Sequence, residues 1–151
     1  METSGHSLEF SVHRRNGARK ETGMAVHVVR LGSPRSADEG LRLGTVRRPP
    51  RGVPKAEHAS RDFYDVWLPE LAPSEALVKQ GLHASDERMW GAFMKRYRAE
   101  MKRPEAARLL ALLAAFSRQT NFSVGCYCAE EARCHRSVLK ALLQEHGAKL
   151  G

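Results

Sequence analysis

A short run near the C-terminus contains residues that could hold a metal ion. Cys126, Cys128, Cys134 and His135 lie within ten consecutive positions. Thiolates and imidazoles are ligands that tetrahedral zinc prefers, and four of them complete a site. The spacing is unusual, because C-x-C replaces the common C-x-x-C and because neighbouring side chains on a helix point about 100° apart. Metal binding by these four residues is one of three interpretations of the run.

The second interpretation is a reactive thiol at Cys134. We expect this residue near the start of a helix, where the partial positive charge lowers the pKa of a thiol. Arg133 and Arg136 would add to that effect. His135 or His146 could act as a base if the fold brings either ring close to the thiol.

The third interpretation is structural. A strand over 121–128 would place Cys126 and Cys128 on its apolar face, where cysteine is commonly buried. The sequence also argues against a cysteine phosphatase, which needs the pattern Cys-x5-Arg. Six positions after Cys126 stands Ala132, and six after Cys128 stands Cys134.

A second group of residues points to an anion-binding cleft, which is the leading functional hypothesis. Arg47 and Arg51 flank the stiff Pro49-Pro50 pair, and guanidinium groups on such a loop can hold phosphate or carboxylate. His135 and Arg136 would join them from the start of the last helix, whose free N–H groups attract anions. The ligand would be a nucleotide, a phosphorylated metabolite or a nucleic-acid backbone. The alternative is a solvated basic loop.

The elements that would position these residues alternate between strands and helices. Apolar and β-branched runs predict strands over 25–31, 41–46 and 121–128, with a short strand or extended segment over 63–68. Apolar residues at helical spacing predict helices over 74–81, 85–103, 104–116 and 136–145. This alternation predicts an α/β fold, with a small, largely parallel layered sheet flanked by helices in a Rossmann-like or flavodoxin-like arrangement.

Length and composition fit one basic domain. The 151 residues carry 25 Lys and Arg against 17 Asp and Glu, a net charge of +8. We predict a basic, disordered or loosely packed tail over 1–23 and a single α/β domain over 24–151. No apolar run approaches the ~20 residues of a spanning helix, so we expect a cytoplasmic protein without a membrane partner. No cofactor is expected on the anion-binding hypothesis, and zinc or iron is the alternative on the metal hypothesis.

Several motifs resemble the YeaO-like branch of the domain-of-unknown-function family 488. They are, in chain order, Arg47-x-x-Pro50-Arg51-Gly52, Trp67-x-x-Glu70-x-Ala72-Pro73-Ser74-x-x-Leu77, His83 and Trp90-x-x-Phe93-x-x-Arg96-Tyr97-x-x-Glu100. The late Cys128-Ala129-Glu130 and Cys134-His135-Arg136 are similar to a strand-end C-x-E and C-H-R element of other branches of that family. The resemblance covers about residues 25–147.

The resemblance implies a compact α/β domain with a candidate cleft and no established reaction. Part of the branch's loop signature differs here, because Val46, Arg48 and Pro49 stand where that branch usually has Asp, Leu and Trp. Arg47, Arg51 and the Ala-Pro-Ser turn match it.

Overall fold

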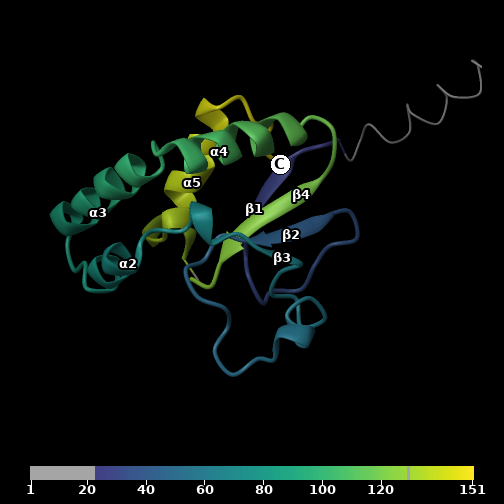
Figure 1. Cartoon of the computed structure of the whole chain (residues 1–151), viewed down its shortest axis with the longest axis horizontal. Helices are drawn as coiled ribbons and strands as arrows, with labels where there is room; N and C mark the ends of the chain where they lie inside the picture. The colour runs from purple at the N-terminus through teal and green to yellow at the C-terminus, as the bar shows by residue number, and fades with distance from the viewer. Residues whose placement is uncertain (1–22, 129) are drawn as a thin grey trace, which may run out of the picture.

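The centre of the molecule is a sheet of four parallel strands (Figure 1). The computed structural model describes residues 23–128 and 130–151. The strands lie in the order β1 (Val26–Arg30), β4 (Phe122–Cys126), β2 (Leu41–Gly44) and β3 (Val66–Trp67), with β4 paired to both β1 and β2. The predicted α/β class and parallel sheet are confirmed. The predicted tail lies outside the described residues, apart from Gly23.

Among the described residues, four α-helices and three short 3-10 turns accompany the sheet. The α-helices are α2 (Glu75–Leu82), α3 (Glu87–Glu100), α4 (Pro104–Phe116) and α5 (His135–Glu145). The 3-10 turns are η1 (Lys55–Glu57), η2 (Pro69–Leu71) and η3 (Glu131–Arg133). Figure 1 shows α4 and α5 over one face of the sheet, and the long connection between β2 and β3 on the other side. Within the described part of the chain, no helix combines the length and apolar character needed to cross a membrane.

Helix α3 forms where its apolar stripe predicts it. Asp86 caps the helix by accepting a hydrogen bond from the Met89 N–H, and Trp90, Phe93 and Tyr97 are buried along one face. The Tyr97 hydroxyl donates to the Leu71 carbonyl at 2.6 Å, so its polar end is satisfied inside the core. This contact fixes the turn before α2 against α3.

All four strands are shorter than predicted, and the difference matters most at β4 and β3. Strand β4 ends at Cys126, so Cys128 lies beyond the sheet instead of on its apolar face. All five β4 residues are buried, as expected of an inner strand covered on both faces. The extended run over 63–68 contributes only Val66 and Trp67 to the sheet, at its edge.

The turn into β2 requires glycine at position 40. Gly40 has φ +79°, and a Cβ there would overlap the main-chain carbonyl oxygen of Asn121. Gly52 has a similar φ of +76°, but no described atom lies within 4 Å of the place a Cβ would occupy.

We therefore expect Gly40→Ala to be more destabilising than Gly52→Ala. Both substitutions force a left-handed conformation, which costs roughly 1–2 kcal/mol for a residue with a Cβ. Gly40→Ala adds overpacking, which typically costs about 1–3 kcal/mol. Urea unfolding of the two variants measures the difference, and equal losses of stability would contradict the overlap at Asn121.

Candidate functional site

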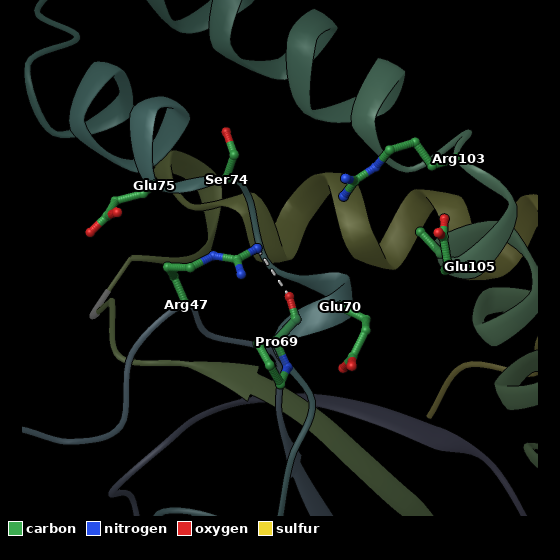
Figure 2. Close-up of a pocket in the computed structure, with 8 residues that line it drawn as sticks. Arg47, Pro69, Glu70, Ser74, Glu75, Arg103 and Glu105 are labelled. Carbon is green, nitrogen blue, oxygen red and sulfur yellow. Dashed lines mark hydrogen bonds between the residues drawn. The ribbon is translucent and has the colours of Figure 1, made fainter.

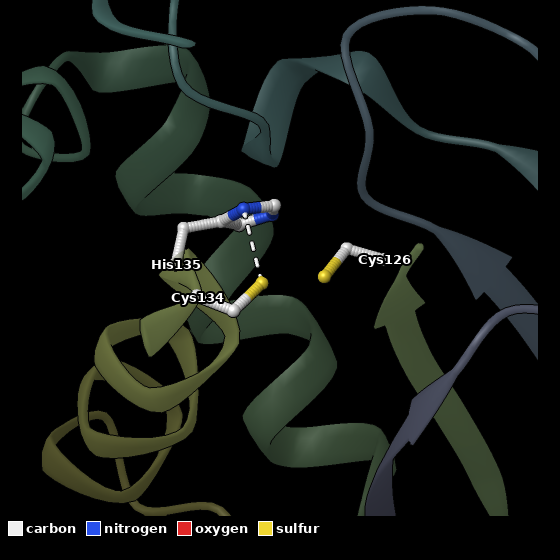
Figure 3. A group of neighbouring side chains, drawn as sticks. All are labelled: Cys126, Cys134 and His135. Atoms are coloured by element: carbon white, nitrogen blue, oxygen red, sulfur yellow. Dashed lines mark hydrogen bonds between the residues drawn. The ribbon is translucent and has the colours of Figure 1, made fainter. Parts of the chain in front are cut away.

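Three side chains that can bind metal meet at the C-terminal end of β4 (Figure 3). Cys126 is the last residue of the strand, Cys134 is the N-cap of α5, and His135 is the first residue of that helix. Their ligand atoms all lie within 4.8 Å of one another, and the three side chains are buried. The C-terminal edge of a parallel sheet is where α/β proteins usually bind ligands.

The backbone at Cys134 explains how two adjacent residues reach one point. Cys134 has φ −138° and ψ 152°, an extended conformation outside the helix. The divergence of about 100° between neighbouring helical side chains therefore does not apply to Cys134 and His135. The Cys134 Sγ lies 3.8 Å from the His135 Nδ1. Two such ligands at zinc distances and a tetrahedral angle would lie about 3.6 Å apart.

A hydrogen bond fixes the tautomer of His135. Its Nε2 lies 2.8 Å from the Thr45 carbonyl oxygen, which can only accept, so Nε2 carries the proton. The Nδ1 that faces Cys134 therefore has a free lone pair. Burial lowers the pKa of His135 to about 4, so the ring is neutral near pH 7. The Tyr97 ring packs edge-on against the imidazole at 5.4 Å and helps to hold its orientation.

Cys128 is the exposed member of the group. Hydrogen bonds from the Cys126 and Cys134 thiols lower the pKa of Cys128, and the charge of Arg136 acts in the same direction. Hydrogen bonds with Cys128 and Cys134, together with burial, raise the pKa of Cys126. The interpretation that buries both Cys126 and Cys128 is confirmed for Cys126 and wrong for Cys128, because the strand ends two residues earlier.

The surroundings of Cys134 raise the pKa of its thiol, whereas the sequence predicts that the helix start lowers it. A hydrogen bond with Cys126 lowers the pKa of Cys134, but the hydrogen bond to Cys128 and burial outweigh it and raise the pKa to about 11. The helix start and the nearby arginines do not overcome these contacts. Among these three cysteines, the pKa is lowered at Cys128 and raised at Cys126 and Cys134.

Arg136 places a positive charge beside the thiols from inside the protein. Its side chain is 4% exposed, and its Nη2 donates to the Cys128 carbonyl at 2.7 Å. Its Nε has no hydrogen-bond partner among the described residues. The guanidinium therefore both holds the loop that carries Cys128 and favours negative charge on the sulfur atoms.

A family model covers the fold and this site together. The model DUF488-N3a, described as the active DUF488-N3 subclade, matches residues 26–147. The chain belongs to the DUF488-N3a family. This match confirms the resemblance to family 488, while the YeaO-like branch is compatible with it and stays a prediction. Comparisons with curated proteins and with solved structures give no match.

Arg47 of this DUF488-N3a chain is engaged by the protein itself. Its guanidinium donates to three main-chain carbonyls in the turn before α2, those of Pro69, Ala72 and Pro73. Figure 2 shows the bond to Pro69. Arg47 lines a cavity of about 470 Å³ whose wall also carries the carboxylates of Glu70, Glu75 and Glu105 and the guanidinium of Arg103. The three hydrogen bonds indicate that Arg47 stabilises the turn before α2.

Arg51 lies at a different cavity. That cavity has a volume of about 420 Å³ and is lined by Arg48, Pro49, Pro50, Arg51, Val53, Phe63 and Tyr127. Neither cavity is lined by His135 or Arg136. The DUF488-N3a fold thus brings His135 and Arg136 together with the cysteines, and it does not bring Arg47 and Arg51 to one cavity.

One contributor to the site carries no signal in the sequence. Thr45 orients His135 through its main-chain carbonyl, while its hydroxyl and N–H both donate to the Gly125 carbonyl. Any residue type supplies such a carbonyl, so only the position just after β2 makes Thr45 useful. Knowledge of the β2–β4 pairing is needed to find it.

Proposed function

We propose that this DUF488-N3a protein binds a thiophilic divalent metal ion, in the first instance zinc, through Cys126, Cys134 and His135, with Cys128 as the fourth ligand. The observation that carries the proposal is the convergence of three buried ligand atoms within 4.8 Å. A set of three sulfur atoms and one imidazole nitrogen is typical of tetrahedral zinc.

The hydrogen bonding around His135 supports a metal ligand. Metal-binding histidines usually donate their second ring N–H to a carbonyl or carboxylate, which fixes the tautomer and the ring orientation. The Thr45 carbonyl fills this role and leaves Nδ1 as the free donor beside Cys134.

The charges around the four proposed ligands also fit a zinc site. Zinc with three thiolates and a neutral imidazole carries a net charge of −1. The buried guanidinium of Arg136 adjoins the Cys128 loop, and the start of α5 adds a partial positive charge. A buried anionic centre needs such compensation, and Arg136 supplies it from within the same helix turn.

A reactive thiol is the second candidate, favoured by the exposure of Cys128. Its lowered pKa and its position at the rim of the group are those of a nucleophilic thiolate. The two candidates differ in how zinc should affect the alkylation rate of Cys128. Zinc should protect this sulfur from alkylation by iodoacetamide on the metal hypothesis, whereas on the thiol hypothesis the alkylation rate is independent of zinc.

Elemental analysis and zinc titration of the purified full chain test the metal site. We expect one zinc ion per chain, and we expect Cys134→Ser and His135→Gln to weaken zinc binding by more than the ~10–100-fold typical of lost outer-sphere partners. His146→Gln, at the exposed C-terminal end of the same helix, is the matched control and should bind zinc as the natural chain does. Protein that takes up no zinc in this titration would contradict the proposal.

A further inference from the structure

The cavity beside Arg51 has walls suited to a ligand that is both anionic and aromatic. Phe63 and Tyr127 supply two rings in edge-to-face contact, with centroids 6.2 Å apart. Arg51 is exposed, and no ion pair joins it to any of the described residues, whereas Arg48 is paired with Glu75. The cavity therefore combines one free guanidinium with an aromatic wall.

The charge of the lining separates this cavity from the one at Arg47. No acidic residue lines the Arg51 cavity, while three glutamates line the other. An anion would meet repulsion in the Arg47 cavity, where the guanidinium is already bound to carbonyls. Of these two cavities, the one at Arg51 offers an unopposed positive charge next to apolar surface.

The loop that carries Arg51 is already held in place. Pro49 and Pro50 restrict its backbone, and the Tyr127 hydroxyl donates to the Arg48 carbonyl at 2.9 Å. A pre-organised loop loses little conformational entropy when a ligand binds. Tyr127 directly follows the last residue of β4, so the cavity lies at the C-terminal edge of the sheet, the usual ligand side of parallel α/β folds.

We propose that this cavity binds a nucleoside monophosphate, with the phosphate on Arg51 and the base against Phe63 and Tyr127. A guanidinium fork matches phosphate oxygens, and aromatic side chains stack on bases of any type. One free arginine suits one phosphate group. The volume of about 420 Å³ lies within the usual range for small-molecule sites, roughly 300–1,000 Å³. The inference goes beyond the metal site and does not require it.

Calorimetric titration of the full chain at low salt, with adenosine 5′-monophosphate as the probe, tests the inference. We expect Arg51→Gln to weaken binding by about tenfold or more, because a charge-assisted contact is lost. Phe63→Leu should weaken binding of the monophosphate, and unmodified adenosine should bind the natural chain less tightly than the monophosphate does. Arg61→Gln is the control, because Arg61 is exposed on the same connection and pairs with Glu57.

Three outcomes would overturn the inference: no binding of adenosine monophosphate, equal affinity in Arg51→Gln and the natural chain, or equal affinity for the nucleotide and inorganic phosphate. Zinc content is measured in every sample. Protein that holds zinc but binds no nucleotide overturns this inference alone, whereas nucleotide binding by protein that takes up no zinc overturns the metal proposal alone.

Discussion

Glu39→Gln is expected to lower the free energy of unfolding by about 3–5 kcal/mol, the usual consequence of removing one partner from a buried ion pair. The Arg42 side chain is fully buried, and its guanidinium bonds to both carboxylate oxygens of Glu39 at 2.7 and 2.9 Å. Ser123 donates to the same carboxylate from β4. The substitution would remove the negative charge and one acceptor, leaving a buried guanidinium with only neutral partners, the glutamine amide oxygen and the main-chain carbonyls of Ser33 and Asp62.

A matched substitution at an exposed pair provides the control for this prediction. Glu57 and Arg61 form an ion pair in which both side chains are about half exposed. Glu57→Gln is expected to change the free energy of unfolding by less than about 1 kcal/mol. Urea unfolding measures both variants, and a loss below 1 kcal/mol for Glu39→Gln would show that the buried pair is not a main support of the sheet.

The same pair predicts how stability responds to acid. Burial raises the pKa of Glu39, but the hydrogen bonds from Arg42 and Ser123 outweigh burial and bring the pKa to about 2 from an ordinary value of 4.5. Because the folded state has the lower pKa, this contribution is complete above pH 4.5 and is lost as the pH falls toward 2. Glu39→Gln should therefore flatten the dependence of stability on pH in this range.

The sequence predicts well those elements whose pattern is decided locally. Helix α3 has an apolar stripe, an Asp86 cap and a following proline, and each signal comes from residues close in the chain. The β-branched run of β1 and the buried run of β4 are likewise found within a residue or two. Local propensity and hydrophobic burial agree in these segments, so tertiary contacts leave the predicted elements largely unchanged.

Strand β2 shows where local pattern fails. Alternation of Leu41, Arg42 and Leu43 would place the arginine in solvent, yet Arg42 is fully buried and Leu41 is 57% exposed. The arrangement depends on Glu39, three residues earlier, and on Ser123, which comes from the neighbouring strand. The sequence gives no sign that these distant residues will pair.

Only part of the candidate site could be predicted from the sequence, because its geometry also depends on the fold. The residue types of Cys126, Cys128, Cys134 and His135 identify a possible metal site. The argument against it treats Cys134 and His135 as neighbours within a helix, although the helix predicted over 136–145 begins after both. The extended backbone of Cys134 removes that objection. Helix α5 begins at His135, one residue before the predicted start, and the extended Cys134 stands directly before it, so the position of the helix start decides whether the ligands converge.

Zinc is expected to raise the free energy of unfolding by about 4 kcal/mol when its free concentration exceeds the dissociation constant 1,000-fold. The ligands come from the end of β4 and the start of α5, so the complete site exists only when these elements are packed together. For a domain of this size, the gain corresponds to an increase in Tm of roughly 8–16 °C. Calorimetric scans with zinc and with a chelator measure it.

The response should depend on the ligands and on pH in a defined way. His135→Gln should lose most of the increase in Tm, while His146→Gln should keep it. Because the pKa values of Cys126 and Cys134 are raised, zinc must displace their protons, and the increase in Tm should therefore shrink as the pH falls. A Tm that is the same with zinc and with chelator would mean that the four side chains meet without holding metal. That result would favour the reactive-thiol candidate, which rests on the exposure and the lowered pKa of Cys128.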